Sequence, residues 1–235
     1  MTVATLTKNI SDVVQSSKLE HTDLNSFLSA WDADYEARIR SIDLFNRSIA
    51  QNYTTEQIQY FIKIFYHARG HFKDFLWHLG NYAPNKNLKD IILENIEEEF
   101  GDTVSHEQLY IDFATQMGVD LTDVMINREY YLPEIKAFNE GHVRWSYANC
   151  WDAQFASFSA YERLDSTDYE ALTNLFPNEH LFFKIHRKAK HFDKTYEELL
   201  AIWDRDPTNI YIAFDFITKT QTKMWQDLSI AIAKV

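Results

Sequence analysis

The sequence contains few cysteines, glycines and prolines, and each shortage narrows the class of protein. Cys150 is the one cysteine in 235 residues, so the chain can form no internal disulfide and fits a reducing compartment. Five glycines and four prolines leave few breaks, which favours long helices. No stretch approaches the roughly 18 apolar residues of a membrane span, and residues 1–18 lack the apolar core of a secretory signal. We therefore expect a cytoplasmic protein.

Positive charge is also scarce. The chain has 23 Lys and Arg against 35 Asp and Glu, a net charge of −12, so we expect it to bind neither nucleic acid nor an anionic membrane. A small-molecule substrate is the expected partner, and a homodimer is left open. Seventeen Phe and 13 Tyr can fill a wide helical core or line a pocket for an apolar ligand. No shift in composition divides the chain, so we expect one helical domain over residues 1–235.

Apolar residues recur at helical spacing through most of the chain, and no strand period competes with them. Thr54 followed by Gln57 predicts a capping box at the start of one helix, and Asp206 followed by Pro207 predicts the start of the last. The predicted fold class is all-α, a bundle of six to nine helices. The expected helices cover about 22–50, 54–80, 87–117 with an interruption at 101–102, 120–126, 133–164, a short segment from 168, 177–203, and the segment after 206.

Acidic residues and histidines recur at spacings that can bring them together. Glu99 and His106 are seven residues apart on one predicted helix, so they share a stripe, separated by roughly 10 Å along the axis. Glu162 lies in the otherwise apolar and small stretch FASFSAYERL, where an unpaired carboxylate is costly. His186 and Asp193 fall on one face of a later helix. Each residue alone is more simply explained as an ordinary surface or packing residue. Together, carboxylates and imidazoles from three helices can form a non-haem iron or manganese site.

Three stretches that contain these residues, EEEFGDTVSH, SAYERL and FKIHRKAKHFDK, resemble the haem-oxygenase-like non-haem di-iron oxidases. The resemblance is to the CADD-like branch, which includes the chlamydial protein associating with death domains. It spans about residues 40–230. It implies a haem-oxygenase-like helical bundle over about 41–235, preceded by an N-terminal extension over about 1–40. It also implies Fe(II), as two ions, with O2 as co-substrate, and the metal ligands Glu99, His106, Glu162, His186 and Asp193.

The sequence departs from the family pattern at several positions. Lys190 stands where the family has a carboxylate, and Asp193 stands where it has the final histidine. Asp102 lies four residues before His106 and competes with Glu99 as a ligand. Phe45 aligns with the tyrosine that the chlamydial-type proteins consume to make p-aminobenzoate, so this self-consuming reaction is not carried over.

Two functions follow from these observations. The first is an O2-dependent non-haem di-iron oxidase or oxygenase that cleaves a C–H, C–C or C–N bond in a small organic acid, such as a fatty acid or an amino acid. The alternative is a metal-free or degenerate CADD-like protein that acts as a binding module, which Lys190 favours. The Glu-x-x-His pairs of ferritin-like bundles are absent, so the commoner di-iron scaffold is not expected.

Two further sequence features give weaker evidence of a function. His67, His71 and His78 fall on one predicted helix, and packing or substrate contact is the favoured role because the glutamate of the zinc-protease motif is missing. Cys150 is interpreted as an inert buried thiol rather than a nucleophile, since its neighbours form no catalytic signature.

Overall fold

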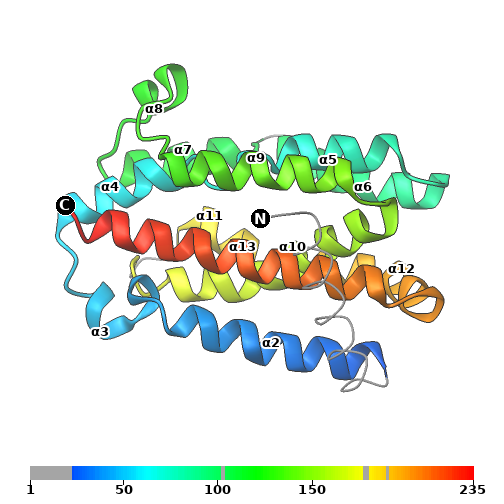
Figure 1. Ribbon diagram of the computed structural model, residues 1–235. Coiled ribbons are helices and arrows are strands. Elements are labelled where there is room, and N and C mark those ends of the chain that lie inside the picture. The colour runs from blue at the N-terminus through cyan, green and yellow to red at the C-terminus, as the bar shows by residue number, and fades with distance from the viewer. Residues whose placement is uncertain (1–22, 102–103, 177–179, 189–190) are drawn as a thin grey trace.

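The computed structural model describes residues 23–101, 104–176, 180–188 and 191–235 (Figure 1). The described part of the chain is helical and holds no strand, which confirms the all-α prediction. The first helices are α2 (Leu24–Arg40), the 3-10 helix η1 (Asp43–Phe45), α3 (Arg47–Ala50), α4 (Thr55–Phe65), α5 (Phe72–Asn81), α6 (Lys86–Phe100) and α7 (His106–Gln116). They are followed by α8 (Thr122–Asn127), α9 (Pro133–Ala148), α10 (Trp151–Leu172), α11 (Leu181–Lys188), α12 (His191–Arg205) and α13 (Thr208–Ile232).

Local sequence signals start several of these helices. The Thr54 side chain accepts a hydrogen bond from the Gln57 backbone N–H at 3.1 Å, and the Gln57 side chain accepts one from the Thr54 N–H at 2.9 Å. This is the predicted capping box, and α4 begins directly after it. The last helix, α13, begins at Thr208, one residue later than the Asp206-Pro207 pair predicted, and the Asp206 side chain accepts a hydrogen bond from the Thr208 N–H at 3.0 Å.

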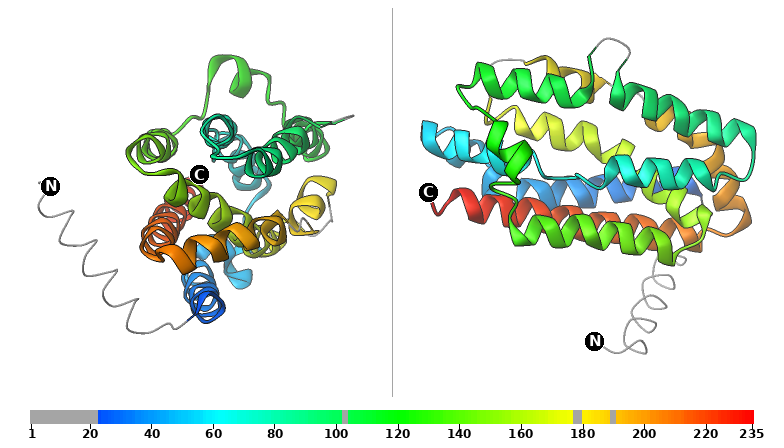
Figure 2. Two further views of the ribbon diagram at one scale, coloured as in Figure 1. Left: turned by 90° about the vertical axis from the view of Figure 1, so that its right-hand side faces the viewer. Right: turned by 90° about the horizontal axis from the view of Figure 1, so that it is seen from above.

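Two long helices, α10 and α13, pack side by side through the middle of the molecule. Helix α2 packs against both from one side, while α4, α5, α6, α7 and α9 lie on the other side (Figures 1 and 2). The space between them is filled by large side chains with almost no exposed surface, among them Trp225, Tyr35, Tyr161, Phe158 and Phe214. Leu24 and Phe27 of α2 also belong to this core. The predicted boundary near residue 40, between an N-terminal extension and the helical bundle, stays a prediction.

Four predicted helices proved to be interrupted, so the described residues form twelve α-helices rather than the expected six to nine. The helix expected over 22–50 is wrong, because α2 ends at Arg40 and is followed by η1 and α3. The helix expected over 133–164 is wrong, because α9 ends at Ala148 and α10 begins at Trp151. Asn149 lies in an extended conformation between them, and its side chain donates to the Trp145 carbonyl at 2.7 Å. The Gln154 side chain donates to the Ser146 and Asn149 carbonyls at 2.8 and 2.9 Å. These side-chain bonds replace backbone bonds that a continuous helix would have made.

The helix expected to begin at Asp168 is also wrong, because α10 continues through this residue to Leu172. Asp168 is fully buried, and its carboxylate accepts four side-chain hydrogen bonds, so it does not cap a helix. The helix expected over 177–203 is two helices, α11 and α12. Its predicted start at Pro177 lies outside the described residues.

The helix expected to carry His67, His71 and His78 is interrupted between Phe65 and Phe72. Arg69 in this connection has a φ of 60°, in the left-handed region that a helix cannot contain. Of the three histidines, only His78 therefore lies within a helix, α5. Within the described ranges, no helix combines the length and apolar character needed to span a membrane.

Candidate metal site

Glu99 and His106 lie on two different helices, so the prediction that they share one helix is wrong. Helix α6 ends at Phe100, and Gly101 follows with a φ of 69°, a conformation that favours glycine. Helix α7 starts at His106, where the Ser105 side chain accepts a hydrogen bond from the Gln108 N–H at 3.1 Å. The turn nevertheless brings the two side chains together, with His106 Nδ1 3.1 Å from Glu99 Oε1. Asp102, the alternative ligand, lies outside the described residues.

Gly101 sets the geometry of this turn, and its replacement by alanine is expected to be costly. A Cβ at this position would stand 2.1 Å from the Val104 carbonyl oxygen, and the backbone has positive φ. We expect G101A to lower the free energy of unfolding by about 2 kcal/mol or more. The measurement is urea denaturation followed by circular dichroism.

Gly141 provides the matched control for this substitution. It lies inside α9, and a Cβ there would meet no heavy atom within 4 Å. We expect G141A to raise the free energy of unfolding by up to about 1 kcal/mol, because alanine favours the helix. Equal effects of the two substitutions would contradict the assigned role of Gly101.

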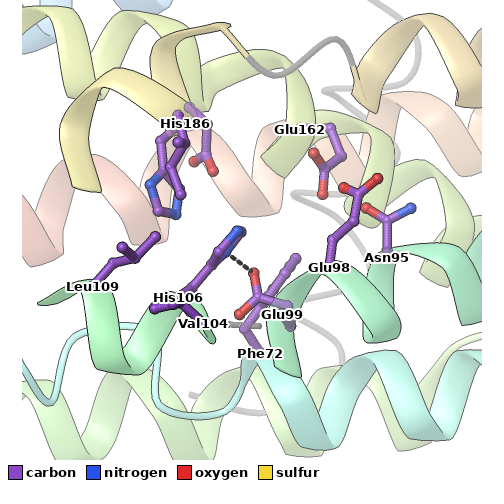
Figure 3. A pocket seen from close by; sticks show the side chains of 11 residues that line it. Phe72, Asn95, Glu98, Glu99, Val104, His106, Leu109, Glu162 and His186 are labelled. Carbon is purple, nitrogen blue, oxygen red and sulfur yellow. Dashed lines mark hydrogen bonds and ion pairs between the residues drawn. The ribbon is translucent and has the colours of Figure 1, made fainter. Parts of the chain in front are cut away.

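Glu162 of α10 and His186 of α11 line the same cavity as Glu99 and His106. The cavity has a volume of about 300 Å³. Figure 3 shows the four side chains reaching into one space, with Glu162 and His186 facing Glu99 and His106. Phe72 and Leu109 contribute apolar walls. Four side chains from four helices thus meet at one cavity.

The His186 ring is held in one tautomer by its surroundings. Its Nδ1 lies 2.7 Å from the Phe182 carbonyl oxygen, which can only accept, so Nδ1 carries the hydrogen and Nε2 keeps its lone pair. The ring stacks on Tyr169 with centroids 4.4 Å apart, and it lies 4.7 Å from the ring of His106. An imidazole whose other nitrogen donates to a backbone carbonyl is the usual arrangement of a metal-binding histidine.

The environment of the cavity shifts the pKa values of three of its side chains. Burial, reinforced by the nearby carboxylates of Asp165 and Glu99, raises the pKa of Glu162 well above its ordinary value. Burial also opposes ionisation of Glu99, but the hydrogen bond and charge of His106 outweigh it and lower the Glu99 pKa. Burial and the neighbouring His106 lower the pKa of His186 to about 4. At neutral pH this leaves an uncharged imidazole among carboxylates, a donor set that suits a divalent cation such as iron.

Asp193, the fifth predicted ligand, lies near the start of α12, is exposed, and is not among the residues that line this cavity. Its role as a ligand stays a prediction. Lys190 lies outside the described residues. Among the residues described, no three His, Cys, Asp or Glu side chains already converge closely enough to hold an ion. Metal binding would therefore require side chains around the cavity to adjust.

The sequence analysis missed Asp165, which lines the cavity three residues after Glu162 on α10. Its spacing of i, i+3 places it on the same helix face as Glu162, and this signal was available in the sequence. Asp165 pairs with Arg69, whose guanidinium also donates to the buried Asp168 at 2.8 Å. The Asp168 carboxylate accepts further bonds from Tyr35 at 2.6 Å, Gln221 at 2.8 Å and Trp225 at 3.0 Å. Arg69 thus connects the cavity wall to the core.

The other candidates do not form part of this cavity. Cys150 is exposed at the start of α10, so the prediction of a buried thiol is wrong, and its Sγ lies 3.4 Å from Asn209 Oδ1. His71 is buried, and hydrogen bonds join it to Asn139 at 3.0 Å and Tyr161 at 3.2 Å. These contacts are those of a packed side chain, and packing is one of the two roles, with substrate contact, that the sequence favoured over zinc binding.

The helices form a haem-oxygenase-like fold. Comparisons with known proteins show to which family the chain belongs. The sequence pattern of a family described as iron-containing redox enzymes matches residues 59–192, more than half of the chain, and the chain belongs to this family. The match includes Glu99, His106, Glu162 and His186.

Two crystal structures of a CADD-like protein of unknown function from Nostoc punctiforme PCC 73102 share the fold, with TM-scores of 0.67 and 0.68. They are 14% and 15% identical in sequence, cover 87% of this chain, and are themselves covered to 95% and 97%. At this identity the likeness concerns the fold alone. A comparison with curated proteins found no match.

Proposed function

We propose that this protein is a non-haem di-iron oxidase or oxygenase that uses O2 to cleave a C–H, C–C or C–N bond in a small organic acid. One observation supports the proposal above all others: Glu99, His106, Glu162 and His186, from four separate helices, line one cavity. Membership of an iron-containing redox enzyme family supports the choice of iron. The number of ions, the use of O2 and the substrate are parts of the proposal.

In this proposal each side chain has a defined task. Glu99, Glu162 and Asp165 supply carboxylate oxygens, while His106 and His186 supply imidazole nitrogens. The hydrogen bond to the Phe182 carbonyl fixes the orientation of His186, and the aromatic rings beside the cavity limit the entry of water. When bound, iron supplies the redox chemistry with O2. The protein holds the metal and directs the substrate toward it.

The proposal predicts iron-dependent consumption of O2. The full chain is produced with added Fe(II), and its iron content is measured by mass spectrometry of the metal. Uptake of O2 is then followed with an electrode across a panel of fatty acids and amino acids. We expect close to two iron ions per chain and substrate-stimulated uptake by at least one panel member. Absence of iron after loading under anaerobic conditions would contradict the proposal.

The second candidate is a metal-free binding module. It is favoured by the finding that, within the described ranges, no three metal-ligating side chains already converge on one point. The same iron measurement distinguishes the two candidates. A chain that takes up no iron from Fe(II) in solution, yet binds an organic acid, would fit the second candidate and exclude the first.

A further inference from the structure

A second cavity, of about 410 Å³, adjoins the candidate metal site. The two cavities share the lining residues Phe72, Glu99, His106, Asp165 and His186. Arg128 and Tyr131 line only the second cavity. A molecule in the second cavity could therefore contact Arg128 and Tyr131 while another part of it meets the candidate metal ligands.

The cationic side chains of this second cavity differ in whether their charge is neutralised. Lys73 Nζ lies 3.6 Å from Glu107 Oε2, and Arg69 pairs with Asp165 and Asp168. Arg128 is exposed, and it takes part in none of the ion pairs formed between described residues. Its guanidinium lies over the ring of Tyr131, with the guanidinium carbon 6.0 Å from the ring centroid. Arg128 is thus available to an anionic ligand.

A bound metal ion would make the second cavity more favourable for an anionic ligand. Arg69, Lys73 and Arg128 line the second cavity together with three acidic residues, Glu99, Glu107 and Asp165. These formal charges balance. A divalent cation bound by Glu99 and its neighbours would make the cavity positive overall, which favours an anion in the remaining space.

Tyr131 is held so that its hydroxyl can donate to such a ligand. Its ring stacks on His67 with centroids 4.6 Å apart and an interplanar angle of 19°. The His67 ring is fixed in turn, because its Nε2 donates to the Glu129 carbonyl at 2.8 Å. The Tyr131 hydroxyl oxygen accepts a hydrogen bond from Asn139 Nδ2 at 2.9 Å. Among the hydrogen bonds of the described residues, the hydroxyl hydrogen has no acceptor, so it can donate to a ligand.

Aromatic side chains also line the second cavity, among them Phe65, Phe72, Tyr169 and Phe182, beside its charged residues and histidines. We propose that Arg128 and Tyr131 bind the carboxylate of a substrate whose apolar body extends along these aromatic walls toward the candidate metal ligands. This inference rests on the proposed function and identifies its substrate class as a monocarboxylate with an apolar body. Arg128 supplies charge and paired N–H donors, and Tyr131 supplies one O–H donor.

The experiment compares ligands that share a body and differ in their head group. Decanoate, decylamine and 1-decanol form one set, and 3-phenylpropanoate and 3-phenylpropylamine form a second. Each is titrated into the full chain by isothermal titration calorimetry, with and without Fe(II), under anaerobic conditions. We expect the carboxylate of at least one set to bind about tenfold or more tightly than its amine, because only the carboxylate can pair with Arg128.

Variants assign this preference to the two residues. We expect R128Q to weaken binding of the preferred carboxylate by about ten- to a hundredfold. R128K should retain part of the affinity and Y131F should lose less than R128Q. Binding of 1-decanol should be unchanged in R128Q, which separates loss of the carboxylate contact from misfolding. R144Q is the matched control, because Arg144 is an exposed arginine of α9 that does not line either cavity.

Unchanged carboxylate binding in R128Q, or a wild-type chain that binds neither carboxylate in preference to its amine, would overturn the inference. These outcomes differ from failure of the proposed function. Arg128-dependent carboxylate binding in a chain that takes up no iron would support this subsite while excluding the oxidase. Iron-dependent O2 uptake without carboxylate preference would support the oxidase and exclude this subsite.

Discussion

Replacement of Glu162 by alanine is expected to remove most of the iron that the wild-type chain binds. Glu162 lines the cavity shared with Glu99, His106 and His186, and metal binding there depends on negative charge. Loss of a residue that merely orients a ligand weakens metal binding by about 10- to 100-fold, so loss of a ligand should cost at least as much. We expect E162A and H186A each to bind Fe(II) at least tenfold more weakly, as measured by anaerobic titration.

Misfolding is not expected to explain the loss in E162A. The pKa of Glu162 is raised chiefly by burial, which means that its charged form is unfavourable in the metal-free protein. Removing this carboxylate should leave the free energy of unfolding of the metal-free chain unchanged or higher. The control is E94Q, because Glu94 is an exposed residue of the same helix as Glu99 and pairs with Lys194 at 2.8 Å.

Two further variants test which aspartate supplies an additional ligand. Asp165 lines the cavity, whereas Asp193 is exposed and does not. We expect D165N to weaken iron binding more than D193N. Wild-type iron binding by both E162A and H186A would contradict the candidate site, whatever the effect of the aspartate variants.

The largest effect on stability is expected from R69M. The side chain of Arg69 is 13% exposed, and it pairs with Asp165 and with the fully buried Asp168. Removing one partner from a buried ion pair leaves the other charge without compensation, which typically costs about 3–5 kcal/mol. Methionine retains the apolar stem, and it meets the same backbone restriction at positive φ as arginine. We therefore expect R69M to lower the free energy of unfolding in urea by this amount.

Arg163 is a comparison for Arg69, because it also donates two hydrogen bonds to carboxylate oxygens but is more exposed to water. Its guanidinium donates to both Asp32 carboxylate oxygens, at 2.7 and 2.6 Å, but the two side chains are 24% and 46% exposed. We expect R163M to cost about 1 kcal/mol or less, because water screens this pair. A loss in R69M no greater than in R163M would show that burial adds nothing to the Arg69 network.

The sequence predicted which segments are helical better than it predicted where the helices end. Apolar spacing and the Thr54 capping box depend on neighbouring residues, and these signals predicted the fold class and the start of α4. The interruption after Phe100 was predicted from Gly101, but the ends near Phe65 and Ala148 depend on other contacts. Arg69 adopts its left-handed conformation while bound to Asp165 and Asp168, residues about 100 positions away in the chain, and such a partner is invisible to local periodicity.

For the candidate site as well, the sequence indicated the residues better than it predicted how they are brought together. Spacing indicated Glu99, His106 and His186, apolar surroundings indicated Glu162, and the family resemblance implied that all four are ligands. The structure brings them to one cavity. Glu99 and His106 meet through a turn at Gly101, however, rather than through a shared helical stripe. Asp165 was not predicted, although its i, i+3 spacing from Glu162 places both carboxylates on one face of α10.

The sequence by itself determined the helical class, the acidic surface charge and the residue types available for chemistry, because composition and short-range periodicity depend on the chain alone. Only the tertiary structure decided that Glu162 is half-buried in a cavity that Asp165 and Glu99 also line, and that Arg128, unlike Arg69 and Lys73, forms no ion pair with the described residues. The physical reason is that burial and charge pairing depend on distances between side chains from different helices, and folding alone sets those distances.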